Sequence, residues 1–365
     1  MIMRRIRVLV VEDSLTVRRR LSEVLDADPE FEVVGEADNG KRAVELCHLL
    51  SPDVITLDMI LPIMTGLDAT EQIMAHCPTP ILVVSSSYNR GELFKTYDAL
   101  AAGAVDVLDK PRGDEPDGEW EQRFRSAVKL VSRIKVITHP RARLGAYGRV
   151  SVPAPVRAPE PRLGAGRGET EIVALGASTG GPAALVTVLR ALPIPFPLPV
   201  IIVLHLDAPF GLAFADWLAQ QTRHQVSYPA DGDLVRSFAG RVAMAPPGQH
   251  LTIASRRFYL TSAPPRHSCR PSIDVLFESV SREYGASVAA ALLTGMGRDG
   301  AAGLLEIRKA GGVTIAQDET TSVVYGMPRE AVLLGAAERV LPLQSIGGVL
   351  AALPRSGEGS NGVES

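Results

Sequence analysis

The sequence predicts two α/β domains, each built on a doubly wound parallel sheet, that are joined by a linker. The length of 365 residues fits two domains. Short apolar runs alternate with helix-period segments in both halves of the chain. Between the halves, residues 138–170 are rich in Pro, Gly, Ala and Arg and have no apolar period.

Five β-branched apolar runs predict five buried parallel strands in the N-terminal half. The runs occupy residues 6–13, 31–37, 53–58, 80–86 and 104–110. Helical periodicity fills the gaps at 14–27, 40–50, 65–77 and 91–103, and a last helix is expected at about 119–136. This order predicts a flavodoxin-like, five-stranded doubly wound domain over residues 1–137.

The same rhythm resumes after the predicted flexible linker, 138–170. Strands are expected at 171–178, 199–205, 287–295 and 313–318, with helices at 272–285 and 301–311. Residues 223–271 are less regular and are expected to form short strands and hairpins. This second domain is assigned to 171–355, and the polar tail 356–365 is expected to be disordered.

Composition excludes several functional classes. The formal net charge is -3, with 46% hydrophobic and 22% charged residues, so no strong field attracts nucleic acid or an anionic membrane. The cysteines Cys47, Cys77 and Cys269 form no CxxC pair and have no histidine at ligand spacing, so neither a disulfide framework nor a zinc site is expected. The chain has no signal-peptide core and no apolar stretch of about 20 residues, so we expect a cytoplasmic protein without membrane insertion.

Acidic residues gather where the N-terminal strands end. Glu12 and Asp13 end the first strand, Asp58 the third, Ser85 the fourth and Lys110 the fifth. Because these ends converge on one edge of a doubly wound sheet, the three carboxylates repel one another unless a cation joins them. Carboxylate oxygens are ligands that suit Mg²⁺. A carboxylate held at such a site can act as a nucleophile toward phosphorus. Lys110 and the Ser85 hydroxyl can then hold the phosphoryl oxygens.

These residues, in this order, resemble the two-component receiver domains. The resemblance covers residues 6–112 and rests on VEDS, the strand-end Asp58, Ser85 and the pair Lys110 and Pro111. It implies that Asp58 accepts the phosphoryl group, with Glu12 and Asp13 as the acidic metal-binding pair. One departure is Val107, where receivers usually carry an aromatic residue.

A glycine turn between a strand and a helix presents Ser178 in the second domain. The sequence GASTG fits the G-x-S-x-G nucleophile elbow, and amides at the helix start, including that of Thr179, can stabilise an oxyanion. His205 ends the next strand, and Asp299 lies on a glycine-rich turn after a third strand. The chain order Ser, His, Asp differs from that of α/β-hydrolases.

The stretch from about 171 to 355 resembles the catalytic domain of the chemotaxis protein-glutamate methylesterases. The matching segments are GASTGG, RPSIDVLFESV, LLTGMGRDGAAGLLEIRKAGG and TIAQDETTSVVYGMPREA. The resemblance implies Ser178 as nucleophile, His205 as general base, Asp299 as its orienting acid, and the Met296 amide as an oxyanion donor beside that of Thr179. No cofactor is expected for this ester hydrolysis. The residues after His205 depart from the family pattern.

The resemblance implies a phosphorylation-activated hydrolase of chemoreceptor glutamate methyl esters that releases methanol and deamidates receptor glutamines. Methyl-accepting chemoreceptors would be the substrates, and a chemotaxis histidine kinase the phosphodonor. Two alternatives stay open. One is a receiver adaptor whose degenerate hydrolase domain only docks on receptors, and the other is an esterase for small molecules.

Overall fold

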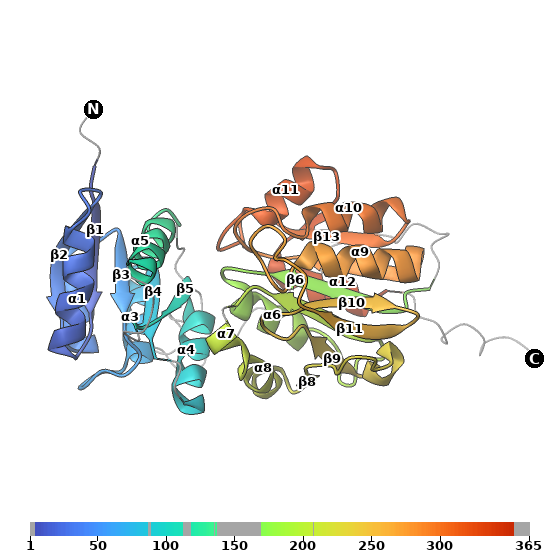
Figure 1. Ribbon diagram of the computed structural model, residues 1–365, viewed down its shortest axis with the longest axis horizontal. Helices are drawn as coiled ribbons and strands as arrows, with labels where there is room; N and C mark the ends of the chain where they lie inside the picture. Colours follow the sequence, from blue (N-terminus) through green and yellow to red (C-terminus); the bar gives the residue numbers. More distant parts are fainter. Residues whose placement is uncertain are drawn as a thin grey trace, which may run out of the picture. The chain divides into compact units, whose positions relative to one another are not determined.

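The computed structural model divides into two compact units, Met1–Val152 and Pro153–Ser365, coloured along the chain in Figure 1. It describes residues 4–86, 89–111, 118–134, 136, 169–206 and 208–353. The predicted linker, apart from 169–170, and the predicted tail lie outside the described residues. The domain boundaries proposed from the sequence therefore stay predictions.

The first unit is a five-stranded parallel sheet in the order β2-β1-β3-β4-β5. Its strands are β1 (Ile6–Val11), β2 (Phe31–Ala37), β3 (Val54–Leu57), β4 (Ile81–Ser85) and β5 (Asp106–Asp109). Its helices are α1 (Leu15–Asp26), α2 (Gly40–Leu50), α3 (Gly66–His76), α4 (Arg90–Ala102) and α5 (Glu119–Val131). This order confirms the predicted flavodoxin-like class, while α5 ends before the predicted residue 136.

Local signals explain where these helices begin. Ser14, Asn39, Thr65 and Asn89 each accept a hydrogen bond from a first-turn backbone N–H of α1, α2, α3 and α4. Helices α2, α3 and α4 pack side by side, while α1 packs with α5. The sheet is thus covered by helices, and its central strands are buried throughout and mostly apolar, as is usual for parallel strands.

The second unit is a seven-stranded parallel sheet in the order β14-β13-β12-β6-β7-β9-β8. Its strands are β6 (Ile172–Ala177), β7 (Val200–Leu204), β8 (Gln225–Ser227), β9 (Arg241–Met244), β12 (Val288–Leu292), β13 (Val313–Gln317) and β14 (Arg339–Leu341). A separate antiparallel hairpin pairs β10 (His250–Ala254) with β11 (Arg257–Thr261). The sheet confirms the predicted parallel α/β class of the catalytic half.

Helices cover both faces of this sheet (Figure 1). One face carries α9 (Ile273–Tyr284), α10 (Ala301–Lys309) and α11 (Met327–Leu333), with the β10–β11 hairpin against α9. The other carries α6 (Gly181–Arg190), α8 (Phe214–Thr222) and α12 (Leu343–Ala351). The short elements are α7 (Ala208–Gly211), η2 (Val235–Phe238) and η3 (Gly285–Ser287).

Residues 223–271 contain the short strands and the hairpin that the sequence predicts, together with η2. The β10–β11 pair is a hairpin, but β8 and β9 instead extend the main parallel sheet beyond β7. The physical reason is burial: Val242, Ala243 and Met244 of β9 are almost completely covered, which suits an interior parallel strand. Within the described residues, no helix combines the length and apolar character needed to cross a bilayer.

Candidate functional sites

The catalytic candidates lie at the carboxyl ends of three adjacent strands, β12, β6 and β7. Ser178 follows β6, His205 follows β7, and Asp299 lies in the loop between β12 and α10. The His205 N–H donates to the Ala177 carbonyl at 3.1 Å, and the Ser178 N–H donates to the Thr294 carbonyl at 3.0 Å. Backbone hydrogen bonds therefore continue the sheet pairing into the site.

Tight backbone packing surrounds Ser178. Gly180 has φ 76° and precedes α6, and the Gly181 N–H donates to the Ser178 carbonyl at 2.6 Å. A Cβ on Gly295 would lie 2.6 Å from the Ser178 Cβ and 2.7 Å from the Met327 Cε, so only glycine fits there. These glycines let the Ser178 loop and the Gly295 loop approach closely.

His205 and Asp299 form a direct pair. His205 Nε2 lies 2.8 Å from Asp299 Oδ2, and Asp299 is only 2% exposed. The same Oδ2 accepts the Ile273 N–H at 2.7 Å, while Oδ1 accepts the Ser272 hydroxyl at 2.7 Å and the Asp274 N–H at 3.1 Å. The Asp299 carboxylate thus lies at the N-terminus of α9, where the helix dipole and free N–H groups favour a negative charge.

Each member of this pair stabilises the charged form of the other. Burial alone would lower the pKa of His205, but the hydrogen bonds and charges of Asp299 and Cys269 outweigh it and raise the pKa to about 9. Burial alone would raise the pKa of Asp299, but its contacts with His205, Ser272 and Ile273 hold that pKa below its usual range. Asp299 is therefore an anion at neutral pH, and it fixes the proton of a neutral His205 on Nε2.

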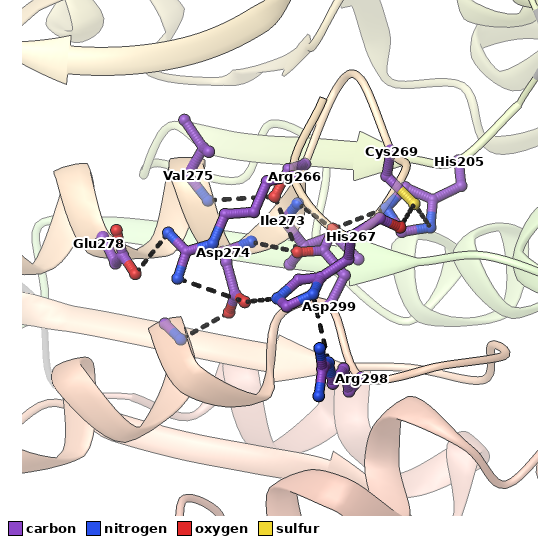
Figure 2. A network of polar contacts seen from close by, with 12 residues as sticks. His205, Arg266, His267, Cys269, Ile273, Asp274, Val275, Glu278, Arg298 and Asp299 are labelled. Atoms are coloured by element: carbon purple, nitrogen blue, oxygen red, sulfur yellow. Dashed lines mark hydrogen bonds and ion pairs between the residues drawn. The ribbon is translucent and has the colours of Figure 1, made fainter. Parts of the chain in front are cut away.

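The second ring nitrogen of His205, Nδ1, faces a cysteine. Cys269 Sγ lies 3.6 Å from Nδ1, and Figure 2 shows the sulfur beside the imidazole ring. Within the described residues, no hydrogen bond joins Ser178 Oγ to His205. Catalytic hydrogen bonds are often long without substrate and tighten only when it binds.

A buried polar network continues from Asp299 along the start of α9 (Figure 2). Asp274 is fully buried, and its pKa is raised by burial against hydrogen bonding from the Gly303 N–H. His267 Nε2 lies 3.2 Å from Asp274 Oδ2, and Arg298 Nε lies 3.3 Å from His267 Nδ1. These contacts give His267 a structural place beside the site.

The predicted oxyanion donors are two backbone amides. Within the described part of the chain, neither the Thr179 nor the Met296 N–H donates a hydrogen bond to a protein group. Thr179 lies just before α6, and Met296 follows Gly295, at which an added Cβ would lie 2.6 Å from the Ser178 Cβ. Both amides are thus close in the chain to the Ser178 contacts and available to a ligand.

Sequence reasoning missed two side chains of this site. Ser272 was expected only to help start a helix, and it does cap α9, but its hydroxyl also holds Asp299. Cys269 has no histidine at ligand spacing in the sequence, although its sulfur lies 3.6 Å from His205 Nδ1, across 64 positions. A cap serine beside RPSID could have been suspected of binding an acid, whereas no local signal marks Cys269.

The acidic residues of the first unit also come together. Lys110 Nζ lies 2.8 Å from Glu12 Oε2 and 3.0 Å from Asp58 Oδ2, and oxygens of Glu12, Asp13 and Asp58 lie within 4.8 Å of one another. Asp58 also accepts its neighbour's amide, Met59 N–H, at 2.8 Å. The geometry brings all three predicted carboxylates to one place, with Asp13 exposed and the other two buried.

The cluster holds more carboxylates than cationic groups, and burial raises the pKa of its two buried acids. Burial and the Asp58 charge raise the pKa of Glu12 to about 7, although Lys110 opposes the shift. Burial likewise raises the pKa of Asp58, again opposed by Lys110. One lysine thus only partly neutralises the two buried carboxylates. Their oxygens fit a hard divalent cation such as Mg²⁺, which prefers carboxylate and water ligands.

Ser85 and Val107 complete the first site. Ser85 ends β4 with a 1% exposed side chain whose hydroxyl has no partner among the described residues, while its carbonyl accepts the Lys110 N–H at 3.1 Å. The neighbouring Ser86 hydroxyl is already bonded to Glu92 at 2.5 Å. This contrast favours Ser85 over Ser86 as the hydroxyl available to the site. Val107 is buried within β5.

Comparisons with known proteins agree over nearly the whole chain. Residues 173–350 match the family described as CheB methylesterase, and residues 8–116 match the response regulator receiver domain. The chain is 44% identical over 352 residues to protein-glutamate methylesterase/protein-glutamine glutaminase 2 of Anaeromyxobacter dehalogenans, covering 96% of this chain and 98% of that protein. It is 42% identical to protein-glutamate methylesterase/protein-glutamine glutaminase 1 of Syntrophus aciditrophicus, covering 96% and 99%. The solved catalytic domain of the Thermotoga maritima CheB methylesterase is 33% identical, covering 50% of this chain and 98% of that chain, with a TM-score of 0.48.

Proposed function

Because the chain belongs to the CheB methylesterase family and carries a response regulator receiver domain, we propose that it is a phosphorylation-activated protein-glutamate methylesterase that also deamidates glutamines. The observation that most supports the proposal is the His205–Asp299 pair at 2.8 Å, one strand away from Ser178. A degenerate, non-catalytic hydrolase domain would have no need to keep a buried carboxylate on this imidazole.

Ester hydrolysis would begin at the Ser178 hydroxyl. Ser178 Oγ attacks the side-chain carbonyl carbon of a methylated glutamate while His205 Nδ1 takes the hydroxyl proton, because Asp299 keeps the ring proton on Nε2. The negative charge that develops on the carbonyl oxygen is stabilised by the Thr179 and Met296 amides. Such a positioned base contributes about 10²–10⁴-fold, and each oxyanion donor about 10²–10³-fold.

Collapse of the tetrahedral intermediate would expel the leaving group. His205 returns its proton to the methoxy oxygen, so that methanol leaves and an acyl-serine remains on Ser178. Water, deprotonated by His205, then attacks the acyl carbon, and His205 returns the proton to Ser178 Oγ as the bond to serine breaks and frees the receptor glutamate. A glutamine side chain would follow the same route with ammonia as the leaving group, so one triad serves both reactions.

Activation would begin at Asp58. Glu12, Asp13 and Asp58 would hold Mg²⁺, which supplies positive charge that offsets the carboxylates and the incoming phosphoryl oxygens. The Asp58 carboxylate attacks the phosphorus of the donor, whose bond to the leaving group breaks as the bond to Asp58 forms, and Lys110 and the Ser85 hydroxyl bind the transferred oxygens. The phosphorylated Asp58 would compete with Glu12 for Lys110, which contacts both carboxylates at present.

The partners follow from the same proposal. The substrates would be methyl-accepting chemoreceptors, and the phosphodonor a chemotaxis histidine kinase, both reached in the cytoplasm. The receiver domain would span residues 1–137, the linker 138–170 and the catalytic domain 171–355, followed by a tail at 356–365. With Val107 buried in β5, the signal would leave the phosphorylation site without an aromatic side chain at that position.

The test uses the full-length chain, Mg²⁺, a small phosphodonor and membranes that carry methylated chemoreceptors. Mass spectrometry of receptor peptides should show methylated glutamates losing their methyl groups and some glutamines becoming glutamates. Hydrolysis of small activated esters without any change in the receptor peptides would contradict the proposal and favour an esterase for small molecules.

A further inference from the structure

The contact between Cys269 and His205 is not needed for ester hydrolysis. Cys269 lies in the loop between β11 and α9, is half-buried, and places Sγ 3.6 Å from His205 Nδ1 and 3.4 Å from the His267 carbonyl oxygen (Figure 2). The sulfur therefore lies beside the nitrogen that must receive the Ser178 proton. A thiol here offers nothing to acyl transfer, since Ser178 is the group at the helix start.

The surroundings of His205 match those of a metal-binding histidine. Zinc-ligating histidines almost always donate the proton on their other ring nitrogen to a carboxylate, a backbone carbonyl or water, which fixes the tautomer and aims the free lone pair at the metal. His205 has this arrangement, with Nε2 on Asp299 at 2.8 Å and Nδ1 directed to the Cys269 side. The pair that orients a general base thus also orients a metal ligand.

The spacing of the two ligand atoms fits a tetrahedral metal. Zinc lies about 2.0–2.1 Å from an imidazole nitrogen and about 2.3 Å from a thiolate sulfur, so a tetrahedral angle separates these atoms by about 3.5 Å. The observed separation between Nδ1 and Sγ is 3.6 Å. Ligand atoms of His205, Cys269 and Asp299 also all lie within 4.8 Å of one another. A cation could therefore bind between His205 Nδ1 and Cys269 Sγ with little movement of the sulfur.

We propose that His205 Nδ1 and Cys269 Sγ bind a thiophilic divalent cation of the zinc class, and that this cation inhibits the esterase. Water fills the remaining coordination positions, and on binding the Cys269 thiol and the Nδ1–H of protonated His205 both release their protons to solvent, without any change of oxidation state. The cation then occupies the lone pair that Ser178 needs. The binding step stands on the geometry alone, whereas the inhibition rests on the proposed function.

Ligand chemistry separates this site from the one in the receiver domain. The cluster of Glu12, Asp13 and Asp58 offers only carboxylate oxygens, which suit Mg²⁺, whereas a thiolate and an imidazole select zinc and similar ions. The sequence predicted no zinc site because Cys269 and His205 are 64 positions apart. Physiological Mg²⁺ should therefore not inhibit the esterase, and zinc should.

Binding can be measured without any enzyme assay. The full-length chain, with Mg²⁺ in excess to occupy the receiver site, is titrated with Co²⁺ in place of zinc. We expect a thiolate-to-cobalt charge-transfer absorption that zinc abolishes. The band should be missing in Cys269→Ala and retained in Cys77→Ala, a half-buried receiver thiol that serves as the matched control. Absence of the band in the wild type, or an equal band in Cys269→Ala, would overturn the proposal.

Inhibition is measured on the same proteins with methylated receptor membranes. Saturating zinc should slow the wild type by at least about 100-fold, since it removes the general base. A chelator should restore the rate. Each protein is compared with its own rate without zinc. Cys269→Ala should need at least about 10-fold more zinc than the wild type for half-inhibition, because losing one ligand weakens the site. If the wild type shows the cobalt band but demethylates receptors at its full rate in saturating zinc, the proposed inhibition is refuted. A cobalt band in a chain that never demethylates receptors would refute the proposed function and leave the metal site standing.

Discussion

Replacement of Asp299 by asparagine tests how the site holds its base. Four donors converge on this carboxylate: His205 Nε2 and the Ile273 N–H on Oδ2, and the Ser272 hydroxyl and the Asp274 N–H on Oδ1. An asparagine keeps one acceptor oxygen and puts an amide donor in place of the other. In either orientation of the asparagine amide, two of the four donors face its NH₂ group, which cannot accept a hydrogen bond.

The two orientations have different costs. With its NH₂ toward His205, the asparagine forces the ring proton onto Nδ1, which blocks the nitrogen needed by Ser178. With its NH₂ toward Ser272, the His205 tautomer survives, but the Asp274 N–H loses its acceptor and the imidazolium loses its counter-charge. We expect a loss of about 10⁴-fold in kcat, the size seen for the matching change in serine proteases, and a loss of stability of about 1–3 kcal/mol for the unsatisfied N–H.

Steady-state methanol release and thermal unfolding measure the two effects separately. Asp274→Asn is the matched control, because that carboxyl is equally buried and next to Asp299 but does not contact His205. It should lose similar stability yet keep most of its kcat. A loss in Asp299→Asn below about 10-fold, or an equal kcat loss in Asp274→Asn, would refute the assignment of Asp299 as the orienting acid.

Three further predictions address protonation, phosphorylation and packing. In buffer with a chelator, kcat/KM should rise about 10-fold per pH unit from pH 7 and level off near 9, because a raised pKa of His205, to about 9, leaves little neutral base at pH 7; a flat profile would contradict this. With Mg²⁺ and a radiolabelled phosphodonor, the wild type should gain label and turn over faster, whereas Asp58→Asn or removal of Mg²⁺ should prevent both; wild-type labelling of Asp58→Asn would exclude that residue as acceptor. Gly295→Ala should lower kcat by at least about 10-fold, since its Cβ would lie 2.6 Å from that of Ser178, while Gly348→Ala, with nothing within 4 Å in a helix, should keep its rate and gain about 0.5–1 kcal/mol of stability; equal rates in the two variants would contradict the close packing.

Much of the fold could be predicted because buried parallel strands carry a strong local pattern. The runs around Val10 and Val203 are continuous and apolar, and the cap residues Asn39 and Thr65 mark helix starts. The β8–β9 extension could not be predicted in the same way. A strand of three or four residues has no clear period, and its pairing with β7 depends on contacts that are distant in sequence.

The residues of the two sites also differ in how well the sequence predicts where they lie. Asp58, Ser178 and His205 follow strands, so the topology of a doubly wound sheet indicates where they lie. Asp299 lies seven positions beyond the end of β12, and the N-terminus of α9 brings in the donors that hold it. Cys269 reaches His205 from a loop between a hairpin and a helix. Such contacts are set by tertiary packing, for which the sequence has no period.

The most direct measurement of the central claim is methanol released from methylated chemoreceptor membranes by the phosphorylated full-length chain and three variants. Ser178→Ala and His205→Ala should each lower the rate by about 10⁴-fold or more, and the double variant should be little worse than either, because nucleophile and base act as one unit. Methanol release by Ser178→Ala at the wild-type rate, or losses that multiply in the double variant, would contradict the account.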